Sequence, residues 1–175
     1  RLTTRAGMCA SILALGAQPP ALGDDAAAGA IDLRAAHIVA PRNLSGPEAK
    51  AVDLLVDEIA ARTRLRLPII AAWPADGAQP VIFVGPASSL EQFSGDFDAD
   101  LAVGSERLPA EGFRIRTLTP RDRAPVVLVI GNDARGVLYG VGKLLRSLTM
   151  SRDRLELASP LEATTAPAMP GSPES

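Results

Sequence analysis

The hydrophobic pattern predicts its firmest helix just after the first predicted strand. Ser45 with Glu48 three residues later forms a capping box, and Pro47 suits the first turn of a helix. Apolar residues then recur at helical spacing and form one stripe, made of Val52, Leu55, Val56, Ile59 and Ala60. This pattern predicts an amphipathic helix that buries a single face.

A second helix is predicted to begin in the stretch GNDARGVLYGVGKLLR, Gly131 to Arg146, and to run to about Thr149. Asp133 is well suited to cap the N-terminus of this helix. Gly136 and Gly140 lie four residues apart and therefore share one helix face, where missing side chains let the helix press closely on a sheet. We expect an adjacent apolar stripe made of Leu138, Val141, Leu145 and Leu148.

Short strands are predicted before, between and after these helices. Alternating or continuous apolar runs place them at Ala30–Pro41, Arg66–Trp73, Gln79–Pro86, Glu111–Pro120, Pro125–Gly131 and Arg154–Leu161. The continuous run Val81–Val84 is typical of a strand buried on both faces. The short turn at residues 121–124 makes its two flanking strands antiparallel. This order of elements predicts an α+β fold, an α/β sandwich in which two main helices cover one face of a mixed sheet.

The composition fits one globular domain, with 47% apolar residues, 22% charged residues and a net charge of −2. The sequence contains no block of basic residues, so nothing in its charge pattern indicates a nucleic-acid partner.

Near the N-terminus, Arg1 and Arg5 precede a short apolar run and then small residues. This pattern predicts a signal peptide over residues 1–23 whose true start is missing, so we expect a periplasmic or extracellular protein. The run is too short to span a membrane, and no other stretch is long enough.

The C-terminal residues 163–175 are rich in Pro, Ser and Thr. Such a composition cannot bury much surface and predicts a linker. We therefore expect the globular domain to occupy residues 30–162.

The glycine-rich stretch does not match a phosphate-binding loop. The P-loop pattern requires Lys and then Ser or Thr after its second glycine, where this chain has Val137 and Leu138. The dinucleotide pattern fails because Asp133 stands at its second glycine. We interpret the glycines as packing positions and expect no cofactor. Arg135 could contact a neighbouring carboxylate or a neighbouring domain, but a solvated side chain in the first turn is the better interpretation.

An acidic segment resembles part of a calcium loop. Asp96, Asp98 and Asp100 occupy its first, third and fifth positions, but Leu101 and Arg107 replace the required Gly and Glu. A solvated acidic loop is the better interpretation, and we assign no metal site.

The remaining residues that could take part in catalysis, metal binding or modification form no recognisable site. His37 is the only histidine, which excludes zinc held by His and Cys, and we interpret it as a buried structural residue. Asn43 begins a glycosylation sequon, although Ser45 serves better as a helix cap. The 20 acidic residues show no spacing that selects a glycosidase pair. We therefore assign no catalytic, cofactor-binding or metal-binding residue.

Four segments together resemble a known family. AKAVDLLVDEIAARTRLRLPI, VIFVG, EGFRIRT and VIGNDARGVLYGVGKLLR occur in that order. They are similar to the N-terminal accessory domain of glycoside hydrolases, as in α-glucuronidases and bacterial β-N-acetylhexosaminidases. The resemblance covers about Ile31 to Met169, and Gly131–Gly140 is its most specific part. Residues Thr165–Pro170 resemble the hinge that leads into the catalytic barrel.

The resemblance implies a zincin-like mixed-sheet domain without a metal centre, which supports a (β/α)₈ barrel and carries no catalytic carboxylates. Because such a barrel needs about 250 residues, we expect this chain to be a fragment that is inactive by itself. Its expected partner is the catalytic barrel of the parent glycoside hydrolase, which acts in carbohydrate degradation. Two alternatives stay open: a carbohydrate-binding module that uses Trp73 or Tyr139, and a small hydrolase with unassigned carboxylates.

Overall fold

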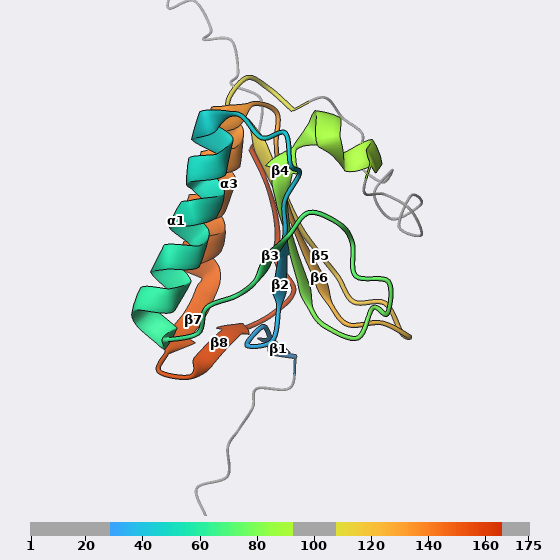
Figure 1. The fold of residues 1–175 in the computed structure, drawn as a ribbon, viewed down its shortest axis with the longest axis vertical. Coiled ribbons are helices and arrows are strands. Elements are labelled where there is room, and N and C mark those ends of the chain that lie inside the picture. Colours follow the sequence, from blue (N-terminus) through green and yellow to red (C-terminus); the bar gives the residue numbers. More distant parts are fainter. Residues whose placement is uncertain (1–28, 93–107, 166–175) are drawn as a thin grey trace, which may run out of the picture.

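The computed structural model describes residues 29–92 and 108–165 of the chain. The predicted signal peptide, the acidic segment Asp96–Asp100 and all but the first residues of the predicted linker lie outside the described residues. Within the described part, two helices pack on a six-stranded sheet, and a three-stranded sheet lies beside one end of the helices (Figure 1). The predicted α+β class is confirmed, while its zincin-like character stays a prediction.

The large sheet is mixed, as predicted. Its strand order is β3-β2-β4-β6-β5-β9, with bounds β2 His37–Val39, β3 Ile69–Ile70, β4 Val81–Pro86, β5 Phe113–Leu118, β6 Val126–Gly131 and β9 Glu162–Thr164. The first four strands in this order run parallel, and β5 runs antiparallel to both of its neighbours. The predicted β5–β6 hairpin is therefore present, with Ile115 opposite Val129.

Helices α1 (Gly46–Thr63) and α3 (Ala134–Ser147) lie side by side on one face of this sheet (Figure 1). At the start of α1, the backbone N–H of Ser45 donates to Glu48 Oε2 at 2.7 Å, as the capping box predicts. Arg64 ends the helix in a left-handed conformation. Four residues of the predicted stripe are buried, with Leu55 and Ile59 facing the sheet, while Ala60 is only partly buried. Within the described residues, no helix is both long and apolar enough to cross a bilayer.

The opposite face of the sheet is covered by irregular segments. The chain between β3 and β4 crosses this side, and the 3₁₀ helix η1 (Ala87–Gln92) lies on the same side of the sheet (Figure 1). A second apolar cluster forms here around Phe83, Val81 and Leu128, with Trp73 and Leu90 packed against it. Meanwhile Ile82 and Val84 point into the helix side of the sheet. The prediction that Val81–Val84 is buried on both faces is therefore confirmed.

The smaller sheet corrects one predicted strand. It consists of β1 (Ile31–Asp32), β8 (Arg154–Leu157) and β7 (Leu148–Ser151), in that order. We expected Ala30–Pro41 to form one strand, but a turn at Arg34 and Ala35 sends β1 and β2 into different sheets. The Asp32 carboxylate accepts the backbone N–H of Arg34 at 2.9 Å and so stabilises this turn. The turn contains no Gly or Pro that would mark it in the sequence.

Three further differences concern the strands. The strand expected over Arg66–Trp73 shortens to β3, which begins directly after Pro68, a residue without an N–H. The helix expected to reach about Thr149 ends at Ser147, because Leu148 is extended and begins the unpredicted strand β7. The unpredicted strand β9 adds Ala163 and Thr164, the first residues of the predicted linker, to the large sheet.

Candidate functional site

The N-terminus of α3 holds a carboxylate of the chain itself. Asp133 Oδ1 accepts the N–H of Gly136 at 2.9 Å, and Oδ2 accepts the N–H of Glu111 at 2.7 Å. The first of these hydrogen bonds, and then the second, lower the pKa of Asp133 below its ordinary value. A negative charge therefore occupies the position where a helix N-terminus would bind a phosphate, so the capping prediction is confirmed and a phosphate would be repelled.

The glycines of this region serve close packing, as interpreted from the sequence. A Cβ on Gly136 would collide with the carbonyl oxygen of Gly112, in the turn before β5. A Cβ on Gly140 would lie 2.8 Å from Val129 Cγ1 on the neighbouring strand. The helix thus approaches the sheet more closely than any side chain at these positions would allow.

The apolar stripe predicted along α3 is partly wrong. The α3 side chains buried in the main apolar cluster are Val137, Val141 and Leu144, whereas Leu148 is buried as the first residue of β7. Leu145 is only partly buried, and Leu138 is 40% exposed. The close approach at Gly136 and Gly140 rotates the contact face toward Val137, which leaves Leu138 pointing away from the sheet.

The exposed Leu138 lines a shallow groove between α3 and the start of β5, which we call the α3–β5 groove. Its volume is about 480 Å³, and its lining residues are Ala110, Glu111, Phe113, Leu138, Tyr139, Gly142, Arg146 and Thr165. Tyr139 is 47% exposed and, with Leu138, gives this surface an apolar centre. Gly142 carries no side chain, and the guanidinium of Arg146 lies over it, with Nη1 3.4 Å from the position of a Cβ.

Charged groups lie along the edge of the α3–β5 groove. Arg135 forms an ion pair with Glu111, and this carboxylate raises the pKa of Arg135. The Arg135 side chain is 72% exposed, as expected for a solvated residue, and it also contacts a neighbouring carboxylate. Within residues 29–92 and 108–165, no ion pair or hydrogen bond involves the Arg146 guanidinium.

The last described residue belongs to the wall of this groove. The backbone N–H of Thr165 donates to the carbonyl oxygen of Phe113 at 3.0 Å. In return, Thr165 Oγ1 accepts the N–H of Phe113 at 3.3 Å. The chain therefore reaches residue 165 while still fixed to β5, at the edge of the groove.

The other sequence candidates are not brought together. Trp73 packs against Phe83 with ring centroids 6.4 Å apart, so its ring belongs to the second apolar cluster. His37 begins β2, is partly buried, and has an Nδ1 atom without a hydrogen-bond partner among the described residues. In the part of the chain that the structure describes, no group of three or more His, Cys, Asp or Glu side chains could hold a metal ion.

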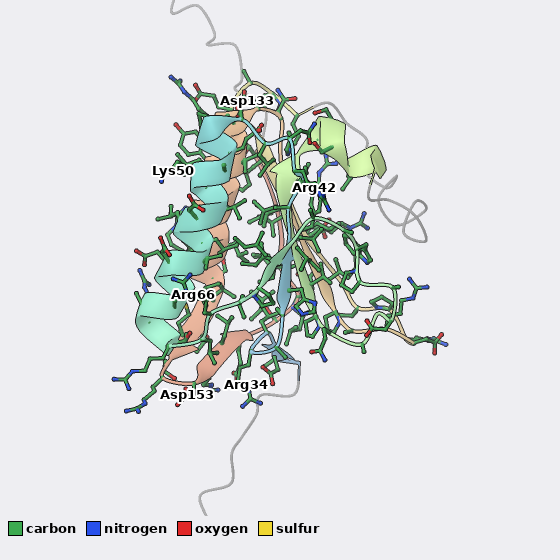
Figure 2. The ribbon with its side chains drawn as sticks, viewed as in Figure 1. Arg34, Arg42, Lys50, Arg66, Asp133 and Asp153 are labelled. Carbon is green, nitrogen blue, oxygen red and sulfur yellow. The ribbon has the colours of Figure 1, made fainter. Side chains whose placement is uncertain are left out.

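A cluster of charges lies at the opposite end of the domain, where Figure 2 shows Arg34 and Asp153 far from Asp133. Asp32 and Glu156 face each other across β1 and β8, and each is paired with an arginine at 2.8 Å. Hydrogen bonds from these arginines, Arg34 and Arg154, lower the pKa of both carboxyl groups. The acid of a glycosidase needs a raised pKa, so these two carboxylates are poor candidates for that role.

Comparison with known families identifies the central part of the chain. Residues 51–144, more than half of the 175, match the family model described as "Glycosyl hydrolase family 67 N-terminus". The matched segment extends from the first turns of α1 through most of α3 and includes β4, β5 and β6. A search of curated proteins found no match.

Solved structures with partial similarity come from much longer chains. A family GH115 4-O-methyl-α-glucuronidase with specificity for decorated arabinogalactans aligns over 67% of this chain and 14% of its own, with 16% identity and a TM-score of 0.47. The protein CpGH84B aligns over 78% of this chain and 19% of its own, with 14% identity and a TM-score of 0.47. This chain thus spans less than one fifth of the length of either protein.

Proposed function

Since the chain belongs to the family of glycosyl hydrolase family 67 N-terminal domains, we propose that it is the non-catalytic accessory domain of an exported glycoside hydrolase. In this proposal the domain supports a (β/α)₈ catalytic barrel that follows it in the parent chain. The observation that carries the proposal is the family match over residues 51–144, which includes most of both helices that pack on the sheet.

The packing and the surface of the domain favour a role in holding another domain in place rather than a role in catalysis. Its central strands are buried between two apolar clusters, which makes the sheet a stiff platform. The Leu138 and Tyr139 side chains stay exposed on the α3–β5 groove, as a contact surface for another domain requires. Export is proposed from the pattern of basic, apolar and small residues in positions 1–23.

The parent activity that we propose is removal of a terminal sugar from a polysaccharide, by an enzyme of the α-glucuronidase or β-N-acetylhexosaminidase type. Two proteins separate the roles: the 175-residue chain and the complete product of its gene. Both are assayed with a glucuronic acid-substituted xylo-oligosaccharide and with 4-nitrophenyl N-acetylglucosaminide. We expect the complete protein to hydrolyse one of these substrates and the 175-residue chain to match the enzyme-free blank. Turnover by the chain alone would overturn the non-catalytic role.

A second candidate function is carbohydrate binding, which the exposed Tyr139 ring favours. An exposed aromatic ring can stack on a sugar, and the Arg146 guanidinium lies in the same groove. Calorimetric titration of the 175-residue chain with xylo- and chito-oligosaccharides tests this alternative. Heat that disappears in the Tyr139→Ser variant would support a binding module, whereas no heat with either class of sugar would reject it for these ligands.

A further inference from the structure

We infer that the catalytic domain of the parent chain packs on the α3–β5 groove, with Tyr139 and Leu138 as its main apolar contacts. This inference rests on the proposed function, because it requires a catalytic domain in the same chain. It goes further by assigning that domain to one surface of the fold and to named side chains.

Exposed apolar side chains are the first support. In the described part of the chain, four large apolar side chains are exposed: Leu54, Ile69, Leu138 and Tyr139. Leu54 lies on α1 and Ile69 on the edge strand β3, whereas Leu138 and Tyr139 are adjacent and line one groove. Single exposed apolar residues are normal on a protein surface. Two adjacent exposed apolar residues that share a groove, one of them a tyrosine, are typical of the core of an interface.

The path of the chain is the second support. Thr165 is hydrogen-bonded to Phe113 in both directions and lines the same groove. Whatever follows residue 165 in the parent chain is therefore tethered at the edge of this surface. Attachment at this point would raise the effective concentration of a linked domain near the α3–β5 groove.

The third support is that the groove is already held in shape. The Asp133 carboxylate joins the start of α3 to Glu111, and the ion pair of Glu111 with Arg135 adds a second link. A surface that is ordered before binding loses less conformational entropy on association. Arg146 adds a positive charge beside the apolar centre, so the matching surface is expected to be apolar with a carboxylate opposite this guanidinium.

Hydroxyl-radical footprinting tests this assignment, with the complete gene product and the 175-residue chain labelled in parallel. Tyr139 is the only tyrosine of the chain, which simplifies its detection by mass spectrometry. We expect its oxidation rate to fall roughly fivefold in the complete protein, because an interface-core residue loses most of its solvent contact. Leu54 and Ile69 serve as internal controls and should be oxidised at the same rate in both proteins.

Matched variants of the complete protein add a functional measurement. Tyr139→Ser should lower the temperature at which the catalytic domain loses activity, whereas Leu54→Ser, at a similarly exposed site on α1, should not. Equal effects of the two variants would overturn the assignment, as would equal Tyr139 oxidation in the two proteins.

The outcomes also separate this inference from the proposed function. If the complete gene encodes no catalytic domain, the proposed function fails, and the docking assignment fails with it. If it encodes an active catalytic domain but Tyr139 stays fully oxidisable, only the docking assignment fails. Protection of Tyr139 in the 175-residue chain by a xylo-oligosaccharide, without protection by the catalytic domain, would overturn docking and support sugar binding instead.

Discussion

Asp133 accepts the backbone N–H of Glu111 at 2.7 Å, although 22 residues separate the two in sequence. The other oxygen of the same carboxylate accepts the N–H of Gly136 and caps α3. One side chain therefore fixes both the start of the helix and the turn that precedes β5. These are the two elements that bound the α3–β5 groove, so the position of the groove depends on this carboxylate.

Replacing Asp133 by Ala should destabilise the domain by about 2 kcal/mol, because the N-cap and a second charge-assisted hydrogen bond are lost together. Urea denaturation of the 175-residue chain measures the change in the free energy of unfolding. Asp57→Ala is the control, since Asp57 lies on the exposed face of α1 and is 3.8 Å from Arg66. Equal losses in the two variants would contradict the double role of Asp133.

The contribution of Asp133 should also depend on pH. The backbone N–H groups of Gly136 and then Glu111 hold its pKa below the ordinary value of 3.8 in the folded chain. A carboxyl group with a lowered folded pKa contributes stability that is fully present above its unfolded pKa and is lost as pH falls through the folded pKa. The difference in unfolding free energy between wild type and Asp133→Asn should stay constant above about pH 5 and shrink as pH falls below 3.8. A difference that persists unchanged at lower pH would refute this origin.

Two glycines of α3 should respond in opposite directions to alanine. Gly136→Ala should destabilise the domain by about 1–3 kcal/mol, because its Cβ meets the Gly112 carbonyl oxygen and neither backbone can move freely. Gly142→Ala should stabilise it by about 0.5–1 kcal/mol, since its Cβ meets only the flexible end of Arg146 and alanine favours the helix. Thermal unfolding followed by circular dichroism measures both. The same sign for both variants would disprove the packing role of Gly136.

Adjacent leucines of α1 offer a matched test of its buried face. Leu55 is fully buried against the sheet, so Leu55→Ala should cost about 2–5 kcal/mol through lost contacts and a cavity. Its neighbour Leu54 is 39% exposed, and Leu54→Ala should cost less than about 1 kcal/mol. Chemical denaturation of both variants under the same conditions decides whether α1 packs in this orientation, and a reversed ranking would rule it out.

Much of the fold could be predicted because local signals agree with the tertiary packing. The capping box at Ser45 and the alternating strand Phe113–Leu118 are marked by their own residues. The break after Asp32 was missed because its turn depends on a side-chain hydrogen bond to Arg34, with no Gly or Pro to indicate it. Strand β9 was missed because its order comes from pairing with β5, a contact between distant segments.

The candidate site was only partly predictable for a related reason. The sequence indicated the capping by Asp133 and the close packing of Gly136, but it assigned Leu138 to the buried stripe. Which side of a helix faces the sheet is set by where the backbones approach most closely, and here two glycines decide it. The ion pair of Arg135 with Glu111 could not be predicted, because Glu111 lies in the turn before β5. Tertiary contacts fix the position of this turn relative to α3.

The central claim is that this domain supports a separate catalytic domain of a glycoside hydrolase. The most direct test is to sequence the gene across the codon for Ser175 and well downstream, in all reading frames. The account predicts an open frame, continuous or shifted by a single base, that encodes a (β/α)₈ barrel with a pair of acidic residues at its carboxyl-terminal face. A stop codon after Ser175 with no barrel behind it would contradict the claim and leave carbohydrate binding as the better account.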